Sequence, residues 1–338
     1  MTRRLSIAFQ TDKTPAEYIA LAQLADQYAF DVVSVYCDAP FHPAYGPLLL
    51  MAPHIRRARI GPAAVSPARI APMDIAAETA LLAGIAAGGV YIGLARGAWL
   101  ADHGIREPDQ PVQAIREAAA IVRLLLSGES GGYEGAVFQL APHVRAPYPL
   151  PNAPVPLLIG TWGRRLGALA GEIADEVKIG GSANPDIIPV MQGYITHGEA
   201  QAGRAPGTVG VVIGAVSVID ADRDQARAAA RRAVSLYLPV VAPLDPTLEI
   251  EPELIARVQD CVSRRDEDAA ARLISDDLLD RFAFSGNPAD IIRQSEALFA
   301  AGASRIEFGT PHGLRPAEGI RLLGEQVLPA LRSARREP

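Results

Sequence analysis

Short apolar runs alternate with longer amphipathic stretches along most of the chain. The short runs are rich in Val, Ile and Leu, as is typical of parallel strands buried on both faces. The longer stretches carry apolar residues at helical spacing. The pattern predicts eight strands, at 5–9, 32–36, 59–65, 90–95, 155–159, 176–179, 209–219 and 305–308. Helical sequence follows each strand, which predicts the α/β class and a (β/α)8 TIM barrel with insertions.

Two segments interrupt this alternation. Residues 128–155 contain a Tyr133–Leu140 run that predicts a hairpin insertion with a turn at Glu134–Gly135. Residues 240–285 are rich in proline at their start and mostly helical in pattern, which predicts a helical insertion inside the last crossover. No segment has the composition of an interdomain linker. We therefore interpret residues 1–338 as one barrel domain, in preference to a doubly wound sheet with a second domain.

Composition excludes several classes of function. The 338 residues carry a net charge of −6 without a basic stripe, so nucleic acid is not an expected partner. The first residues lead directly into a strand, and no run of about 18 apolar residues occurs. We therefore expect no membrane partner and a cytoplasmic location. The two cysteines and six histidines lack the spacing of a metal site, so no metal is expected.

Glycine-rich turns follow two of the later strands. The segment Gly160-Thr161-Trp162-Gly163 leads into a predicted helix, whose free N–H groups and dipole favour an anion. Gly180-Gly181 ends the next strand and would let the backbone approach a ligand closely. Both turns suit a phosphate group. The alternative is that these glycines only make tight connections between strand and helix.

Polar residues at other strand ends are candidates for chemistry, because barrel active sites lie at this face. Arg96, followed by Gly97, could bind a phosphate or carboxylate, or form a salt bridge at the rim. Asp38 could orient a ligand or base, or cap the next turn. His42 and His312 are candidate catalytic groups, with a structural role as the alternative.

Four segments together resemble the bacterial-luciferase-like superfamily, and within it the F420-dependent branch that includes methylenetetrahydromethanopterin reductase. The segments are the strand that ends at Asp38, the Ile-Gly-Pro-Ala-Ala-Val-Ser-Pro block at 60–67, the strand and turn at 89–98, and 156–175 with its Ala-Gly-Glu-Ile-Ala-Asp motif. The resemblance covers nearly the whole chain. It implies a (β/α)8 barrel, a homodimer, and a deazaflavin lying across the C-terminal mouth.

The resemblance also implies site residues. A non-prolyl cis peptide is expected at Ala63–Ala64, followed by Val65, where the backbone supports the cofactor ring. The family's phosphate-binding turns correspond to 160–163 and 180–181, and Arg96 and Gly97 correspond to the turn near the cofactor tail. Asp38 corresponds to a position at the ring.

Two positions depart from the family pattern. Relatives that oxidise a sugar phosphate carry His where this chain has Ala39, and an acid where it has Ala98. Loss of both proton-handling groups disfavours alcohol oxidation and favours reduction of an activated C=C or C=N bond. His42, His312 or Tyr36 could substitute for them.

We therefore expect an oxidoreductase that transfers a hydride between coenzyme F420 and a small organic substrate. The alternatives are an FMN-dependent monooxygenase of the luciferase-like type and a non-catalytic flavin-binding relative.

Overall fold

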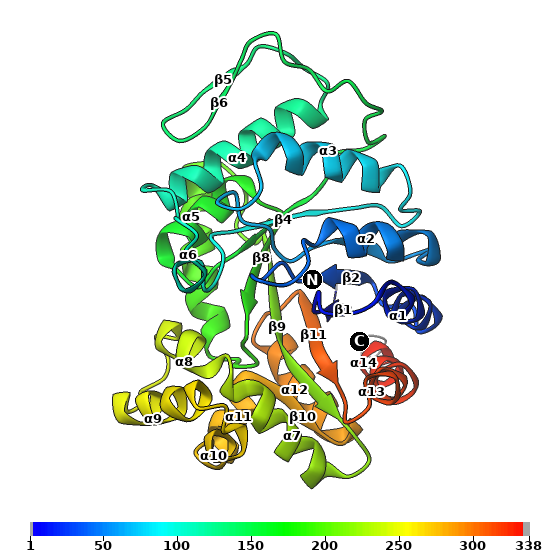
Figure 1. The fold of residues 1–338 in the computed structure, drawn as a ribbon, viewed down its shortest axis with the longest axis vertical. Helices are drawn as coiled ribbons and strands as arrows, with labels where there is room; N and C mark the ends of the chain where they lie inside the picture. Colours follow the sequence, from blue (N-terminus) through cyan, green and yellow to red (C-terminus); the bar gives the residue numbers. More distant parts are fainter. Residues whose placement is uncertain (1–2, 334–338) are drawn as a thin grey trace. The chain divides into compact units, whose positions relative to one another are not determined.

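A computed structural model describes residues 3–333, and each of the eight predicted strands forms (Figure 1). The strands are β1 (Arg4–Phe9), β2 (Val32–Val35), β3 (Arg59–Pro62), β4 (Ile92–Ala95), β7 (Leu157–Gly160), β8 (Glu176–Gly180), β9 (Gly210–Ile219) and β11 (Arg305–His312). β3 ends earlier than predicted, whereas β11 continues beyond Phe308.

The chain divides into two compact units. The first contains Lys178–Tyr194, the chain from Gly210 on and the start of the chain as far as Ile7, and the second contains Ala8–Val177 and Ile195–Val209. The interpretation of the whole chain as a single domain remains a prediction.

The strand order within each unit is that of a barrel. In the first unit β9 lies between β11 and β8, and β11 is also hydrogen-bonded to β1. In the second unit β2 pairs with β3, and β4 pairs with β7. Parallel bridges from Ile60 to Val90 and from Val65 to Leu94 connect the β3 segment to the β4 segment. This order, with parallel pairing of β2 with β3, β4 with β7 and β11 with β9, confirms the (β/α)8 barrel.

A ninth strand, β10 (Ala283–Gly286), was not predicted. It pairs in parallel with the end of β9, from Ala283 opposite Val216 to Gly286 opposite Ile219. Four residues are too few to show a periodicity of their own, so the sequence pattern merges them with the helical insertion before them.

Local signals explain where the helices begin. At the start of α1 the Thr14 hydroxyl accepts from Glu17 N, and the Glu17 carboxylate accepts from Thr14 N at 2.8 Å. Asn287 and Asp290 form the same reciprocal cap on α12. Such caps satisfy N–H groups that have no partner inside the helix. The barrel helices are α1 (Pro15–Gln27), α2 (Tyr45–Met51), α3 (Pro72–Ala83), α4 (Pro111–Leu126), α5 (Arg164–Ile173), α6 (Ile187–Gln201), α7 (Arg223–Ser235), α12 (Pro288–Ala300), α13 (Pro316–Leu322) and α14 (Leu328–Ser333).

The hairpin insertion is anchored to α4 by one carboxylate. Its strands β5 (Tyr133–Glu134) and β6 (Gln139–Leu140) are antiparallel, and Figure 1 draws them beside α4. The buried Glu117 of α4 accepts from the N–H groups of residues 136, 137 and 138, at 2.7, 2.9 and 2.7 Å. The predicted turn at Glu134–Gly135 is therefore wrong: Glu134 pairs in the strand, and the turn follows it because the carboxylate collects three successive amides.

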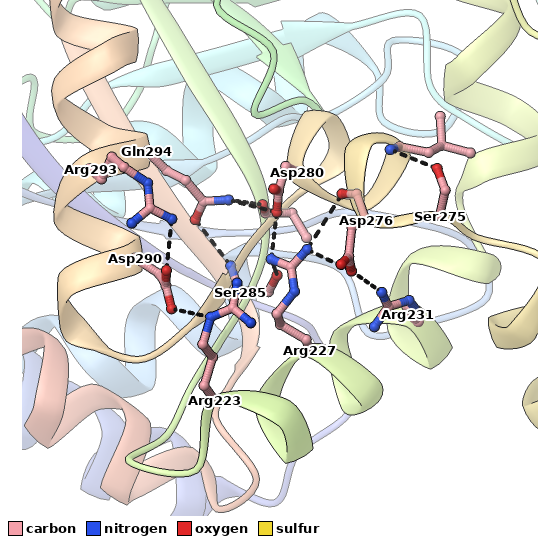
Figure 2. Close-up of polar contacts among 12 residues, drawn as sticks. Arg223, Arg227, Arg231, Ser275, Asp276, Asp280, Ser285, Asp290, Arg293 and Gln294 are labelled. Atoms are coloured by element: carbon pink, nitrogen blue, oxygen red, sulfur yellow. Dashed lines mark hydrogen bonds and ion pairs between the residues drawn. The ribbon is translucent and has the colours of Figure 1, made fainter.

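The helical insertion contains α8 (Leu238–Val241), α9 (Pro252–Ser263), α10 (Glu267–Arg272) and α11 (Asp276–Phe282). Apolar side chains of α7, including Ala226, Ala230 and Val234, pack with those of the insertion. Figure 2 shows a polar network at the same place: the buried Arg227 of α7 donates to Asp276 at 2.9 Å and to Asp280 at 2.6 Å. Pairing with Arg227 lowers the pKa of Asp276. The network fixes α11 on α7.

One glycine of the Ala-Gly-Glu-Ile-Ala-Asp motif serves helix packing. A Cβ at Gly171 of α5 would lie 2.1 Å from the carbonyl oxygen of Ile195 in α6, so only glycine allows the two helices this close. Within residues 3–333, no helix has both the length and the apolar character needed to cross a membrane.

Candidate functional site

The ends of β1 and β2 are joined by side-chain hydrogen bonds. Asp38, beyond β2, accepts from Gln10 Nε2 at 3.1 Å. Gln10 is buried, and its Oε1 accepts from Thr11 N at 2.9 Å. Because Thr11 binds the amide oxygen, the amide nitrogen is directed toward Asp38. Gln10 was not predicted as a site residue, although its place directly after β1 is a signal, because β1 and β2 are neighbours in a barrel.

His42 belongs to the same group of loops. Its backbone N–H donates to Thr11 O at 3.1 Å, and its side chain is exposed. Gln10 and Thr11 therefore hold both Asp38 and His42, while Tyr36 is half-buried just before them. The catalytic roles of Asp38, His42 and Tyr36 remain predictions.

Arg69 is a second residue of this region that was not predicted from the sequence. Its Nη1 donates to the carbonyl oxygen of Cys37 at 2.5 Å, directly before Asp38. Burial raises the pKa of the Cys37 thiol. Arg69 thus supports the backbone beside Asp38, and Cys37 is a neutral buried side chain.

Small residues pack against one another at the ends of β3, β4 and β7. The predicted cis peptide at Ala63–Ala64 is present. A Cβ at Gly93 would lie 2.1 Å from Pro62 O and 3.2 Å from Ala64 Cβ, and one at Gly160 would lie 3.3 Å from Ala95 Cβ and 4.0 Å from Ala64 Cβ. We call Ala64, Gly93, Ala95 and Gly160 the small-residue cradle. Val65, next to it, is fully buried.

Arg96 is held in an ion pair at the end of β4. Its Nε and Nη2 donate to the two carboxylate oxygens of Glu107 at 2.6 and 2.7 Å, and these bonds raise the pKa of Arg96. The side chain is 52% exposed, as in the rim salt bridge weighed above. Gly97 has φ +100°, a left-handed conformation that favours glycine. Binding of a cofactor tail by Arg96 and Gly97 remains a prediction.

The turn after β7 leads into an uncapped helix. Gly163 N donates to Thr161 Oγ1 at 2.9 Å, and no side chain caps α5. Its first turn contains no acid, and instead Arg164 and Arg165 are exposed there. Positive side chains beside the positive end of a helix dipole are unfavourable unless an anion binds between them. This end of α5 is therefore suited to a phosphate group.

The turn after β8 is used differently. Gly181 has φ +79°, and the N–H groups of Gly181 and Ser182 both donate to Gly214 O, at 2.7 and 3.1 Å. Ala183 N donates to Arg281 O at 2.8 Å. These amides are engaged within the protein, so Gly180 and Gly181 could meet a ligand by close backbone approach and not by donation from these groups.

His312 ends β11 after a cis peptide at Thr310–Pro311. It is 1% exposed and has φ +75°, which is uncommon for a residue other than glycine. A Cβ at Gly319 of α13 would lie 2.0 Å from His312 O, so this backbone is packed directly against α13. A catalytic role for His312 also remains a prediction.

Charged groups are also buried inside the first unit. Lys178 of β8 and Glu307 of β11 form an ion pair across the intervening β9. A Cβ at Gly214 of β9 would lie 3.2 Å from Lys178 Cε, so glycine provides the room for this pair. Within the part of the chain that the structure describes, no three His, Cys, Asp or Glu side chains gather as a metal site would require.

The family follows from a match along most of the chain. The model of the luciferase-like monooxygenase family matches residues 3–305. The chain belongs to this family. A 5,10-methylenetetrahydromethanopterin reductase of Archaeoglobus fulgidus is 27% identical over 338 residues, covering 97% of this chain and 100% of the relative.

Solved structures share the fold. The coenzyme F420-dependent tetrahydromethanopterin reductase of Methanopyrus kandleri matches with a TM-score of 0.89 at 24% identity, over 98% of this chain and 100% of its own. A monooxygenase of Streptomyces bottropensis matches with a TM-score of 0.70 at 19% identity, over 96% of this chain and 99% of its own. A reductase and a monooxygenase thus both have this fold.

Proposed function

We propose that this luciferase-like protein is an oxidoreductase that transfers a hydride between coenzyme F420 and a small organic substrate. The observation that carries the proposal is the small-residue cradle at the ends of β3, β4 and β7, beside the uncapped start of α5. A flat ring system needs a surface free of large side chains, and its phosphate needs amides and positive charge. The similarity to a reductase over 97% of the chain supports the same choice.

The residues fit the two ends of such a cofactor. Ala63 and Ala64 would lie against the ring, with Val65 buried behind them. Thr161, Trp162 and Gly163 with the first turn of α5 would hold the phosphate. A bound deazaflavin supplies a two-electron hydride carrier. The chain itself provides a preformed surface, so the position of the ring is set before substrate binds.

The polar groups favour reduction. Gln10 directs its amide at Asp38, so this carboxylate has a defined orientation at the strand ends. Ala39 and Ala98 provide no proton-handling group at positions where sugar-phosphate oxidising relatives carry one. A polarised C=C or C=N bond accepts a hydride with less acid–base assistance than removal of a hydride from an alcohol requires.

Parallel titrations with F420 and with FMN test the proposal. We expect saturable binding of F420, followed by cofactor absorbance, and weaker binding of FMN. Binding of FMN alone would favour the FMN-dependent monooxygenase, which the family name and the Streptomyces monooxygenase fold support. Tight binding of F420 without turnover of unsaturated or imine substrates would favour a non-catalytic relative.

We also propose a homodimer that forms through α3. Met73 and Leu81 of α3 and Ile85 just beyond it are 49%, 56% and 41% exposed. Their spacing of multiples of four places them on one helical face. A contiguous exposed apolar face is typical of a protein interface, and a second copy of the chain offers the same face in a twofold arrangement.

A further inference from the structure

The Ala-Gly-Glu-Ile-Ala-Asp motif at 170–175 forms the last turn of α5 and the two residues after it. The last carbonyl groups of a helix have no N–H partner inside the helix. In α5, Gly171 O accepts from Arg204 Nη1 at 2.8 Å. Ile173 O accepts from Nη2 of Arg123, which belongs to α4. Since positive charge is favourable at this end of a helix, both guanidinium groups hold the C-terminal end of α5 in place.

Asp175 joins this end of α5 to the start of β7. Its Oδ2 accepts from Leu157 N at 2.8 Å, and its own N–H donates to Leu157 O at 2.8 Å. Leu157 is buried and is the first residue of β7, so its N–H depends on this acceptor. Desolvation lowers the pKa of Arg123, and the nearby charge of Asp175 opposes this shift. We call Asp175, Arg123 and Arg204 the Asp175 clamp.

The loop that carries Arg204 is itself fixed on α6. The buried carboxylate of Glu199 accepts from Gly207 N at 2.9 Å and from Val209 N at 2.8 Å. The carbonyl oxygen of Glu199 accepts from Arg204 N at 2.8 Å. A Cβ at Gly198, the preceding residue, would lie 1.8 Å from a carbonyl oxygen of α5, so the backbones of the two helices are in contact. Arg204 therefore donates to α5 from a fixed position.

β7 and α5 carry the two parts of the proposed site at their other ends. β7 ends at Gly160 of the small-residue cradle, and α5 begins at Arg164, beside the proposed phosphate position. With 10 residues, α5 is about 15 Å long. A tilt of about 4° at the clamp would therefore move the start of α5 by about 1 Å relative to the cradle. Displacements of this size weaken binding to a preorganised site.

We propose that Asp175 is a positioning residue, which fixes the spacing between the small-residue cradle and the start of α5 by joining the opposite ends of β7 and α5. The inference rests on the proposed function, in which one cofactor occupies both parts of the site. A ligand that spans both parts depends on their spacing, whereas a ligand that fills only one part does not.

The decisive variant is Asp175→Ala, which removes the side-chain acceptor of Leu157 N. We expect the dissociation constant for F420 to rise by about tenfold. The dissociation constants for a deazaflavin without the phosphate and for inorganic phosphate should each stay within about twofold, because each of these ligands fills one part of the site. Fluorescence titration measures binding of the two deazaflavins, and calorimetry measures binding of phosphate.

Three further variants sharpen the test. Asp175→Asn keeps an oxygen that can accept from Leu157 N, so F420 binding should stay within about twofold. Glu172→Gln removes a carboxylate of the same motif whose ion pair, at 2.7 Å, joins α5 to Arg116 of α4, and it should also bind F420 within about twofold. Arg123→Met removes one donor to the end of α5. It should weaken F420 binding by about threefold to fivefold, and it serves if D175A does not fold.

An unchanged dissociation constant for F420 in D175A, or in Arg123→Met if D175A does not fold, would overturn the inference. So would an equal loss for F420 and for either partial ligand, because one part of the site would then itself be damaged. If the unaltered protein binds FMN but no F420, the proposed function fails, and the same comparison with FMN, riboflavin and inorganic phosphate decides the inference. Binding of neither cofactor would contradict both.

Discussion

At the scale of single residues, Gly163 is a position where the effect of an added charge on binding can be measured apart from the effect of added side-chain volume. Its φ of −90° and ψ of 142° are open to any residue, and a Cβ there would meet nothing nearer than Thr161 Oγ1 at 3.8 Å. A side chain can therefore be added at the start of α5 without a steric penalty. The effect of a charged substitution at Gly163 on cofactor binding then shows whether an anionic group binds at this end of α5.

Gly163→Asp should weaken F420 binding by about tenfold or more, because it adds a negative charge where the phosphate is proposed to bind. Gly163→Ala is the matched control and should bind within about twofold of the unaltered protein. Fluorescence titration measures both. An equal loss in the two variants would indicate crowding, and no loss in either would contradict the proposed place of the phosphate.

At the scale of elements, one carboxylate holds a whole hairpin. Burial by itself raises the pKa of Glu117, but hydrogen bonds from Phe138 N, the Gln113 side chain, Val137 N and Ala136 N outweigh it, and the net pKa lies below the ordinary value. A carboxyl group whose pKa is lowered in the folded state stabilises the fold above its unfolded pKa of about 4.3, and this contribution is lost as pH falls through the folded pKa.

Glu117→Gln should therefore lower the free energy of unfolding by about 2 kcal/mol at pH 7, because hydrogen bonds to a charged acceptor are replaced by contacts with an amide. Denaturant titrations of both proteins from pH 7 to pH 3 measure the difference. It should be largest above about pH 5 and shrink as Glu117 of the unaltered protein becomes protonated. A difference that is constant with pH would show that the charge is not what anchors the hairpin.

At the scale of the whole molecule, the apolar face of α3 is left exposed to solvent by the single chain. Phe41, before the neighbouring α2, and Leu50, within it, are also exposed, at 39% and 37%. Among residues 3–333, five of the eight exposed large apolar side chains thus fall between residues 41 and 85. This concentration argues for an interface and against scattered surface residues.

Leu81→Glu should convert the proposed dimer to a monomer, because it would bury a charge in an apolar interface. Sedimentation velocity at several concentrations measures the change. Ala200→Glu, at an exposed position of α6, adds the same charge elsewhere and should leave the dimer intact. An unaltered protein that sediments as a monomer would contradict the proposed interface.

Much of the fold could be predicted from the sequence, because the signals are local. Thr14 with Glu17 defines the start of α1, and the apolar runs define all eight barrel strands. β10 was not predicted, because its four residues form a strand only by pairing with β9. The strand ends were located well enough to select Asp38, Arg96 and Gly163 as candidates, whose roles remain predictions.

The sequence by itself determined the barrel, the two insertions and the positions at which chemistry can occur, because periodicity, capping and glycine content act between near neighbours. Only the tertiary structure decided the partners of those positions. It paired Arg96 with Glu107, directed Gln10 at Asp38, and joined Asn184 to Arg281 across 97 residues. Such contacts depend on strand register and on how the helices pack, which no short stretch of sequence encodes.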